Sequence, residues 1–319
     1  MARGLGPSVW IQRFPQLFGL IGLWILLLFY FAVWVPHFYG FGTLGNILQF
    51  STILALVTLG QCLVILAGGA GIDLSVGGIV SLAGTVMAFV AQTAVGTVPA
   101  IVICLLFGAL LGSINGILVV RFKILPLIAT LGTFFVFYGL AQAITGGAPQ
   151  AGFEKWFAFL GRQRIGHLPI HFLGMVLPAF AMAYLVLTCA PLGRWIYAMG
   201  CNELAARLTG IHVSRVRFGL YVLSGMLSAT AALVANAWLM SARPDIGYNL
   251  ELESLTAALL GGVSIFGGKG NVIGVLAAVL FIVTLKTGLQ LAGVNSVWQM
   301  GLVGLMLILS VFIEQFQRT

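Results

Sequence analysis

The sequence contains very little charge. Only 7% of its 319 residues are Asp, Glu, Lys or Arg, whereas 61% are hydrophobic. Because soluble domains carry about 25% charged residues, this chain cannot cover its surface with polar groups in water. Its apolar runs are also continuous, which excludes the alternating segments of about ten residues in a membrane β-barrel. We therefore predict an all-α, polytopic helical membrane protein whose main solvent is lipid.

The sequence also lacks the signatures of catalysis and of bound metal. Its four cysteines form no C-x-x-C pair, so neither a disulfide framework nor a zinc site is predicted. His167 and His171 have the spacing of a metal pair on a helix, but the intervening Pro169 disfavours a helix there. We interpret these histidines as part of a solvated loop. We expect no enzymatic activity, no metal and no cofactor in this chain.

A phosphate-binding loop is absent as well. The segment from Gly262 to Lys269 contains a glycine too many before the lysine, and no hydroxyl residue follows it. If transport by this protein consumes ATP, the nucleotide is therefore bound by a separate subunit.

Ten apolar runs approach the length of about 20 residues that a membrane-spanning helix needs. The eighth is short and is interrupted by Gly261 and Gly262, which is the form of a half-helix. The predicted spans are 17–35, 47–67, 78–95, 98–120, 124–144, 172–190, 216–240, 252–266, 272–292 and 296–313. We treat residues 1–319 as a single transmembrane domain with about ten helices, some of them short or broken.

The basic residues predict the orientation, because Lys and Arg accumulate in cytoplasmic loops. With both termini inside, the loop 191–215 is cytoplasmic, the loop 145–171 is periplasmic and Lys286 lies within a span. The cytoplasmic side then holds Arg3, Arg13, Arg121, Lys123, Arg194, Arg207, Arg215, Arg217, Lys269 and Arg318. The other side holds Lys155, Arg162, Arg164 and Arg243. The net charge of +8 thus reflects topology, and we do not expect nucleic acid as a partner.

Residues 68–78 combine glycines with Asp73 and Ser75 between two apolar runs. An acid at membrane depth is costly and commonly marks a transport route or a hinge. Alternatively, Asp73 or Ser75 caps the helix that follows. The two interpretations are compatible. Residues 261–270 are loosely similar to this stretch, but the similarity is too weak to establish an internal repeat.

Small residues recur at every fourth position in several spans, as in Gly108, Gly112 and Gly116. This spacing allows two helix backbones to approach closely. The contact is expected within one subunit or, alternatively, between two subunits.

The loop 191–215 contains the signals of a short helix. Asn202 is a suitable N-cap, Glu203 lies in the first turn where the helix dipole favours an acid, and Gly210 can end the helix. An isolated capped helix in a cytosolic loop is explained if it docks on another protein. A plain surface helix along the membrane is the alternative.

A second cluster is acidic. Asp245, Glu251 and Glu253 gather near the outer end of the seventh and eighth spans. This cluster indicates either the mouth of a transport route or a rim on which another protein docks. Alternatively, it is a solvated loop.

Several stretches also follow one another in a recognisable order. They are 71–77, 193–211, 221–225, 251–257, 261–270 and 288–294, with Trp298 and Gln299. Through them the chain, over about residues 45–313, resembles the permease subunits of bacterial ABC sugar importers of the ribose, xylose and galactose type. One departure is Cys201, which stands where the family usually has a glycine before the loop helix.

The resemblance implies a permease in the bacterial inner membrane that imports a monosaccharide, with a pentose-like sugar expected. It implies a second permease subunit, identical or different, an ATP-binding cassette subunit and a periplasmic sugar-binding protein. Alternatives are a secondary transporter driven by an ion gradient, or an ABC permease for a nucleoside, a polyol or a furanose signal.

The expected roles of individual residues follow from these patterns and the resemblance. Coupling to the ATPase is expected from Asn202, Glu203, Ala205, Ala206, Arg207 and Gly210. A translocation path or hinge is expected at Asp73, Ser75, Asn115, Gly261 and Gly262. Docking of the binding protein is expected at Arg243, Asp245 and Glu251.

Overall fold

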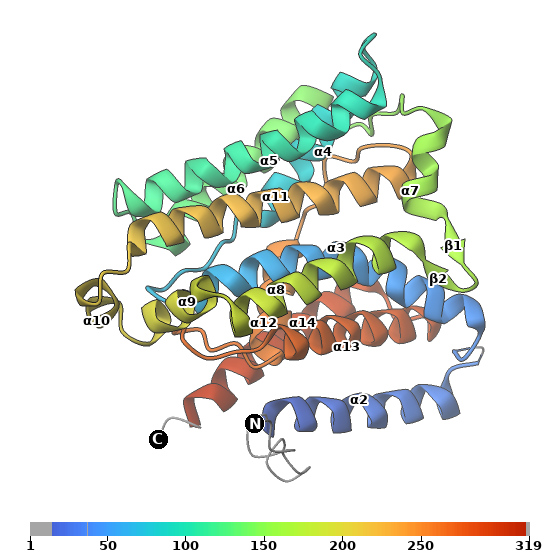
Figure 1. The fold of residues 1–319 in the computed structure, drawn as a ribbon. Helices are drawn as coiled ribbons and strands as arrows, with labels where there is room; N and C mark the ends of the chain where they lie inside the picture. Colours follow the sequence, from blue (N-terminus) through green and yellow to red (C-terminus); the bar gives the residue numbers. More distant parts are fainter. Residues whose placement is uncertain (1–14, 37, 317–319) are drawn as a thin grey trace.

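The computed structural model describes residues 15–36 and 38–316, which fold into a helical bundle (Figure 1). Its main helices are α2 (Pro15–Trp34), α3 (Phe41–Leu66), α4 (Val76–Ala91), α5 (Thr97–Val120), α6 (Pro126–Thr145), α8 (Leu177–Cys189), α11 (Val213–Leu239), α12 (Leu250–Leu260), α13 (Val272–Leu291) and α14 (Ser296–Phe316). The predicted all-α architecture is confirmed.

Shorter elements connect these helices. They are the 3₁₀ turn η1 (Lys155–Phe157), α7 (Ala158–Arg162), strands β1 (Arg164–Ile165) and β2 (Leu168–Pro169), the π-helix η2 (Phe172–Val176), α9 (Pro191–Cys201) and α10 (Glu203–Leu208). The two strands form an antiparallel hairpin in which Arg164 pairs with Pro169. The loops 145–171 and 191–215 are therefore more structured than the sequence suggested.

Each of the ten predicted runs contains a helix, but the helices differ in length. Six of those in the described residues are long and apolar enough to cross a membrane, and α2, α4 and α14 have shorter apolar stretches. Helix α12 has only 11 residues, about 16 Å at 1.5 Å per residue, so it cannot cross a bilayer by itself. The half-helix at the eighth run is thus present, and it ends just before Gly261.

The bundle has two distinct ends, which we name the α10 end and the hairpin end after the elements found there (Figure 1). The first residues of α2 and the last of α14 both lie toward the α10 end (Figure 1). This arrangement agrees with two termini on one side of the membrane. Arg3, Arg13 and Arg318, which contributed to the predicted orientation, lie outside the described residues.

The centre of the bundle is α3. In its apolar window 94% of the residues are buried, against 61% for α11 and α13 and 28% for the helix that contains α8. The peripheral helices expose large side chains, such as Leu106 of α5, Phe135 of α6 and Met182 of α8. An apolar surface of this extent fits contact with lipid or with another membrane protein.

The bundle contains an internal repeat. Helices α3–α6 and α11–α14 have the same order of one long helix, one short helix and two further helices. Helix α3 begins near the hairpin, where Gly45 lies against Arg164, whereas α11 begins at the α10 end, where Arg217 meets Glu203. The two sets therefore run in opposite directions, as in the inverted repeats of many transporters.

The sequence echo between 68–78 and 261–270 does not mark this repeat, because these stretches occupy different places in the two halves. Instead they touch one another: a Cβ atom on Gly267 would lie 2.5 Å from the Cα atom of Gly68. The similar glycines reflect a shared close contact at the α10 end.

The predicted glycine packing is found on α5. A Cβ atom on Gly112 would overlap the carbonyl oxygen of Tyr221, and one on Gly108 would overlap Ala229, both on α11. The close contact is thus made between α5 and α11 of the same chain, as small residues at this spacing allow.

Candidate functional site

The loop 191–215 folds as two short helices rather than one. Helix α9, which the sequence did not predict, begins with Pro191 at its first position, where a missing N–H costs nothing. Near its end, Gly200 packs directly on the backbone of Leu66 and Gly268, and Gly68 packs on Gly200. Any larger side chain at Gly200 would collide with this backbone, so glycine allows α9 to sit tightly on the bundle.

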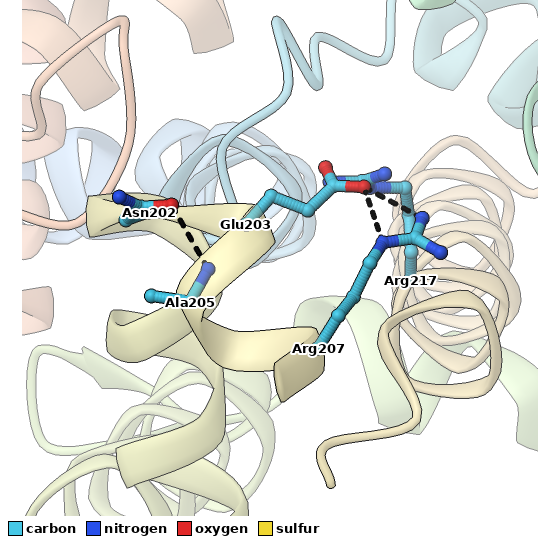
Figure 2. Close-up of polar contacts among 5 residues, drawn as sticks. All are labelled: Asn202, Glu203, Ala205, Arg207 and Arg217. Atoms are coloured by element: carbon cyan, nitrogen blue, oxygen red, sulfur yellow. Dashed lines mark hydrogen bonds and ion pairs between the residues drawn. The ribbon is translucent and has the colours of Figure 1, made fainter. Parts of the chain in front are cut away.

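Helix α10 has the caps that its sequence predicts, and Figure 2 shows the N-terminal one. The Oδ1 atom of Asn202 accepts a 3.0 Å hydrogen bond from the backbone N–H of Ala205. At the other end, Gly210 has a φ of +85°, its N–H donates to Arg207 O, and the N–H of Ile211 donates to Ala206 O. This is a Schellman ending, in which a left-handed glycine satisfies the last carbonyls.

Glu203 fixes α10 to the bundle. One carboxylate oxygen accepts from Arg207 at 2.7 Å and the other accepts from Arg217 of α11, also at 2.7 Å (Figure 2). The hydrogen bond from Arg217 is the main cause that lowers the pKa of Glu203. The Arg217 guanidinium also lies against Gly69, where a Cβ atom would come within 2.5 Å of its Nη2 atom. Glu203 thus connects α10 to both α11 and the glycine stretch 68–71.

The outer face of α10 is apolar. Leu204 and Leu208 are 69% and 82% exposed, whereas Ala206 is buried toward the bundle. Residues four apart lie on the same side of a helix, so the two leucines form one exposed patch. These leucines were not predicted as site residues, although their spacing is visible in the sequence. Arg217 was not predicted either, because only folding brings it to Glu203.

Asp73, Ser75 and Asn115 meet in the interior. Asp73 accepts hydrogen bonds from the Ser75 backbone N–H (3.1 Å) and hydroxyl (2.6 Å) and from the Ser224 hydroxyl of α11 (2.8 Å). The Asn115 amide donates to Ser75 and accepts from Thr133 of α6. These side chains therefore form one polar chain across four segments. The predicted capping is not found, because Ser75 is the N-cap residue of α4 but its side chain makes no capping hydrogen bond, and the backbone N–H from which Asp73 accepts belongs to Ser75, just before the helix. All three candidates are fully buried.

Gly261 and Gly262 lie elsewhere. The N-termini of the short helices α4 and α12 meet, because Gly77 packs on Gly247 and on the carboxylate of Glu251. Gly261, at the opposite end of α12, packs instead on Gly274 and Val275 of α13. The structure does not bring the two glycines to Asp73.

The predicted acidic cluster divides into three environments. Asp245 forms an exposed ion pair with Arg243 at 2.8 Å, and the side-chain hydrogen bond from Arg243 lowers the pKa of Asp245. Glu251 is only 7% exposed, so it is not available on the surface. Glu253 forms a 2.6 Å ion pair with Lys286. Only Arg243 and Asp245 of the three docking candidates lie on the surface.

The interpretation of His171 as part of a solvated loop is wrong. This side chain is 1% exposed, and its ring nitrogens lie 2.9 Å from the Thr52 hydroxyl and from the Gln49 side-chain oxygen. His171 therefore joins η2 to α3. Within residues 15–36 and 38–316, no three His, Cys, Asp or Glu side chains gather as a metal site would require.

Comparison with known proteins identifies this helical bundle as a membrane permease. Residues 43–311 match the family described as "Branched-chain amino acid transport system / permease component". The chain belongs to this family of multi-pass membrane proteins.

Curated relatives are similar over nearly their whole length. Identity to the ribose import permease protein of Bacillus subtilis is 39% over 297 residues, covering 92% of this chain and 91% of the relative. Identity to the ribose import permease protein of Escherichia coli K12 is 36% over 286 residues, covering 88% and 87%. The fructose import permease protein of Rhizobium meliloti is 35% identical over 316 residues, covering 95% and 86%. The resemblance seen in the sequence is confirmed. No solved structure matches the chain.

Proposed function

We propose that this protein is the permease subunit of an ATP-binding-cassette importer that carries a monosaccharide across a bacterial inner membrane into the cytoplasm. The relatives named as import permeases for ribose and fructose support a sugar as substrate. A pentose or a sugar of similar size is the proposed cargo. The chain itself carries out no catalysis and binds no cofactor.

The observation that carries this proposal is α10. It is a short helix with both ends capped, held to the bundle through Glu203 and Arg217, and it presents Leu204 and Leu208 to the outside. An exposed apolar pair on a fixed helix is suited to a groove on a partner protein. We propose that the partner is the ATP-binding cassette subunit, and that α10 transmits its movement to the permease.

The other proposed partners follow from the class of transporter. A second permease subunit completes the assembly, and a periplasmic sugar-binding protein delivers the cargo at the hairpin end. The exposed pair of Arg243 and Asp245 supports docking there, because rim charges guide the association of two proteins. In this orientation both termini and α10 face the cytoplasm.

The direct test is accumulation of sugar in proteoliposomes. We expect uphill uptake of D-ribose or D-fructose only when the cassette subunit, the binding protein and ATP are supplied together. Accumulation by the permease alone on a proton or sodium gradient would instead establish a secondary transporter.

The coupling role is tested by Glu203→Arg. This change places like charges beside Arg207 and Arg217, so α10 should lose its attachment while the spans still insert into the membrane. We expect sugar uptake to fall at least tenfold while ATP hydrolysis by the assembled complex continues. The charge-reversed pair Glu203→Arg with Arg217→Glu is the control and should recover part of the uptake. Normal uptake by the single variant would contradict the assignment.

A further inference from the structure

A cavity of about 280 Å³ lies where the second half of the repeat packs on α3. Its wall includes Phe50 of α3, Trp238 of α11, Glu253 of α12, Lys286 and Gln290 of α13, and Gln299 of α14. Small-molecule sites are concave, mostly apolar and furnished with a few converging polar groups, with volumes from about 300 Å³ upward. At about 280 Å³ this cavity lies just below that range, so it suits a ligand no larger than one small ring.

The cavity contains an ion pair between partly exposed side chains, which is unusual among membrane-spanning helices. Glu253 and Lys286 form a 2.6 Å ion pair between α12 and α13. Ion pairs in such surroundings are costly, because desolvation opposes the Coulomb attraction, and ionisable residues among spanning helices commonly mark transport routes. The Gln299 side chain is 8% exposed and uses its amide nitrogen to donate to Val294 O.

The aromatic groups offer a flat apolar face beside these polar atoms. The rings of Phe50 and Trp238 pack edge to face, with centroids 5.2 Å apart and planes at 90°. The C–H face of a sugar ring is apolar and its edge carries hydroxyls, so an aromatic ring next to hydrogen-bonding side chains complements both parts. Tryptophan combines a large apolar face with a polar tip in this way.

The inverted repeat relates the helices around the cavity to those of the first half. In the first half, the polar chain through Asp73, Ser75 and Asn115 lies where α4, α5, α6 and α11 meet. Asn115 and Gln290 are each the nineteenth residue of their helices, α5 and α13. In transporters built from inverted repeats, substrate sites form at the interface of the repeats beside discontinuous helices. The cavity next to the half-helix α12 has this position.

We propose that this cavity is a monosaccharide site on the transport route, in which the sugar stacks on Trp238 and hydrogen-bonds Glu253, Gln290 and Gln299. Lys286 positions the Glu253 carboxylate. This inference rests on the proposed function, and it assigns sugar contact to residues other than Asp73, Ser75 and Asn115. A lipid chain as the occupant is the competing outcome.

The first test compares Gln290→Leu with Gln142→Leu in the reconstituted complex of permease, cassette subunit and binding protein. Gln142 is a half-buried glutamine near the end of α6, outside the cavity, and serves as the matched control. The loss of one hydrogen bond to the sugar should raise the KM for uptake of D-ribose or D-fructose by about three- to tenfold in Gln290→Leu only. Identical kinetics in both variants would overturn the site while leaving the proposed function intact. Absence of any sugar uptake by the unmodified complex would refute the proposed function itself.

The second test does not depend on turnover. Gln290→Cys and the exposed neighbour Ala292→Cys are each made in a background of Cys189→Ser and Cys201→Ser, and labelled with N-ethylmaleimide. We expect D-ribose or D-fructose, at concentrations that saturate uptake, to slow labelling at position 290 by at least threefold and to leave position 292 unaffected. Labelling at 290 that responds to added lipid but not to sugar would assign the cavity to lipid and overturn the inference.

Discussion

Two acids of this protein show how surroundings decide a residue's role. Glu203 is paired with two arginines near the surface, whereas Asp73 is buried and receives hydrogen bonds only from hydroxyl and backbone donors among the described residues. The first forms ion pairs within α10 and between α10 and α11. The second is a buried connection between the start of α4 and α11.

The pairing of Glu203 predicts a pH dependence of stability. Because its pKa is lowered in the folded protein, the pairing stabilises the fold above the ordinary pKa of 4.5, and this contribution is lost as the pH falls through the lowered value. In thermal unfolding from pH 7 to pH 3.5, Glu203→Gln should be less stable by at most about 1 kcal/mol at pH 7, since the pair is partly exposed. The difference should shrink as the pH falls below 4.5. A difference that grows on acidification would contradict the ion pair.

Asp73 predicts a contrast between two substitutions. Asp73→Ala removes the acceptor for the Ser75 and Ser224 hydroxyl groups, so both buried O–H donors lose their partner, which should cost about 1–3 kcal/mol. Asp73→Asn retains an acceptor oxygen and should lose clearly less stability in the same unfolding measurement in detergent. Equal losses in the two variants would show that the charge, rather than the hydrogen bonds, holds α4 in place.

At the scale of elements, the contact between α5 and α11 depends on missing side chains. Gly112→Leu would drive a large side chain into the carbonyl of Tyr221, so α5 and α11 would have to separate. Overpacking of this kind costs at least about 1–3 kcal/mol. The matched control is Gly132→Leu on α6, because nothing lies near Gly132. The melting temperature in detergent should fall by several degrees in the first variant only, and equal melting profiles would argue against close packing there.

The helices themselves were largely predictable, since long apolar runs and capping residues are local properties. Asn202 and Gly210 lie within two residues of the ends of α10. The spacing of the glycines in α5 correctly predicted a close contact with another helix. Helix α9 was missed because its seating relies on Gly68 and Gly268, which are distant in sequence. The contact of Arg217 with Glu203 and the cavity were missed for the same reason, because both depend on residues that are distant in sequence. The walls of the cavity come from five helices.

At the scale of the whole molecule, the orientation rests on basic residues and is open to a direct test. An epitope tag inserted at Gly166, in the turn of the hairpin where a Cβ atom would meet nothing, should be reached by antibody in intact spheroplasts. A tag after Thr319 should be reached only after the membrane is permeabilised. The reverse pattern would place α10 outside the cell and defeat the proposed coupling to a cytoplasmic ATPase.

The surface of this chain has two kinds of apolar region, and they suit different neighbours in the proposed transporter. The sides of the bundle expose apolar side chains that suit lipid or a second permease, whereas α10 offers only two leucines. If α10 docks on the cassette subunit as proposed, the driving force enters through this small contact and reaches the bundle through α9, which packs tightly on Gly68 and Gly268.

The sequence by itself determined the solvent of this protein, the helical fold and the ends of most helices, because charge content, apolar length and capping act over a few neighbouring residues. It also carried the family resemblance. Only the tertiary structure decided which acids are buried, which arginine holds α10 and where a cavity remains between the two halves. Those features depend on packing between segments far apart in the chain, and a linear pattern contains no distances between such segments.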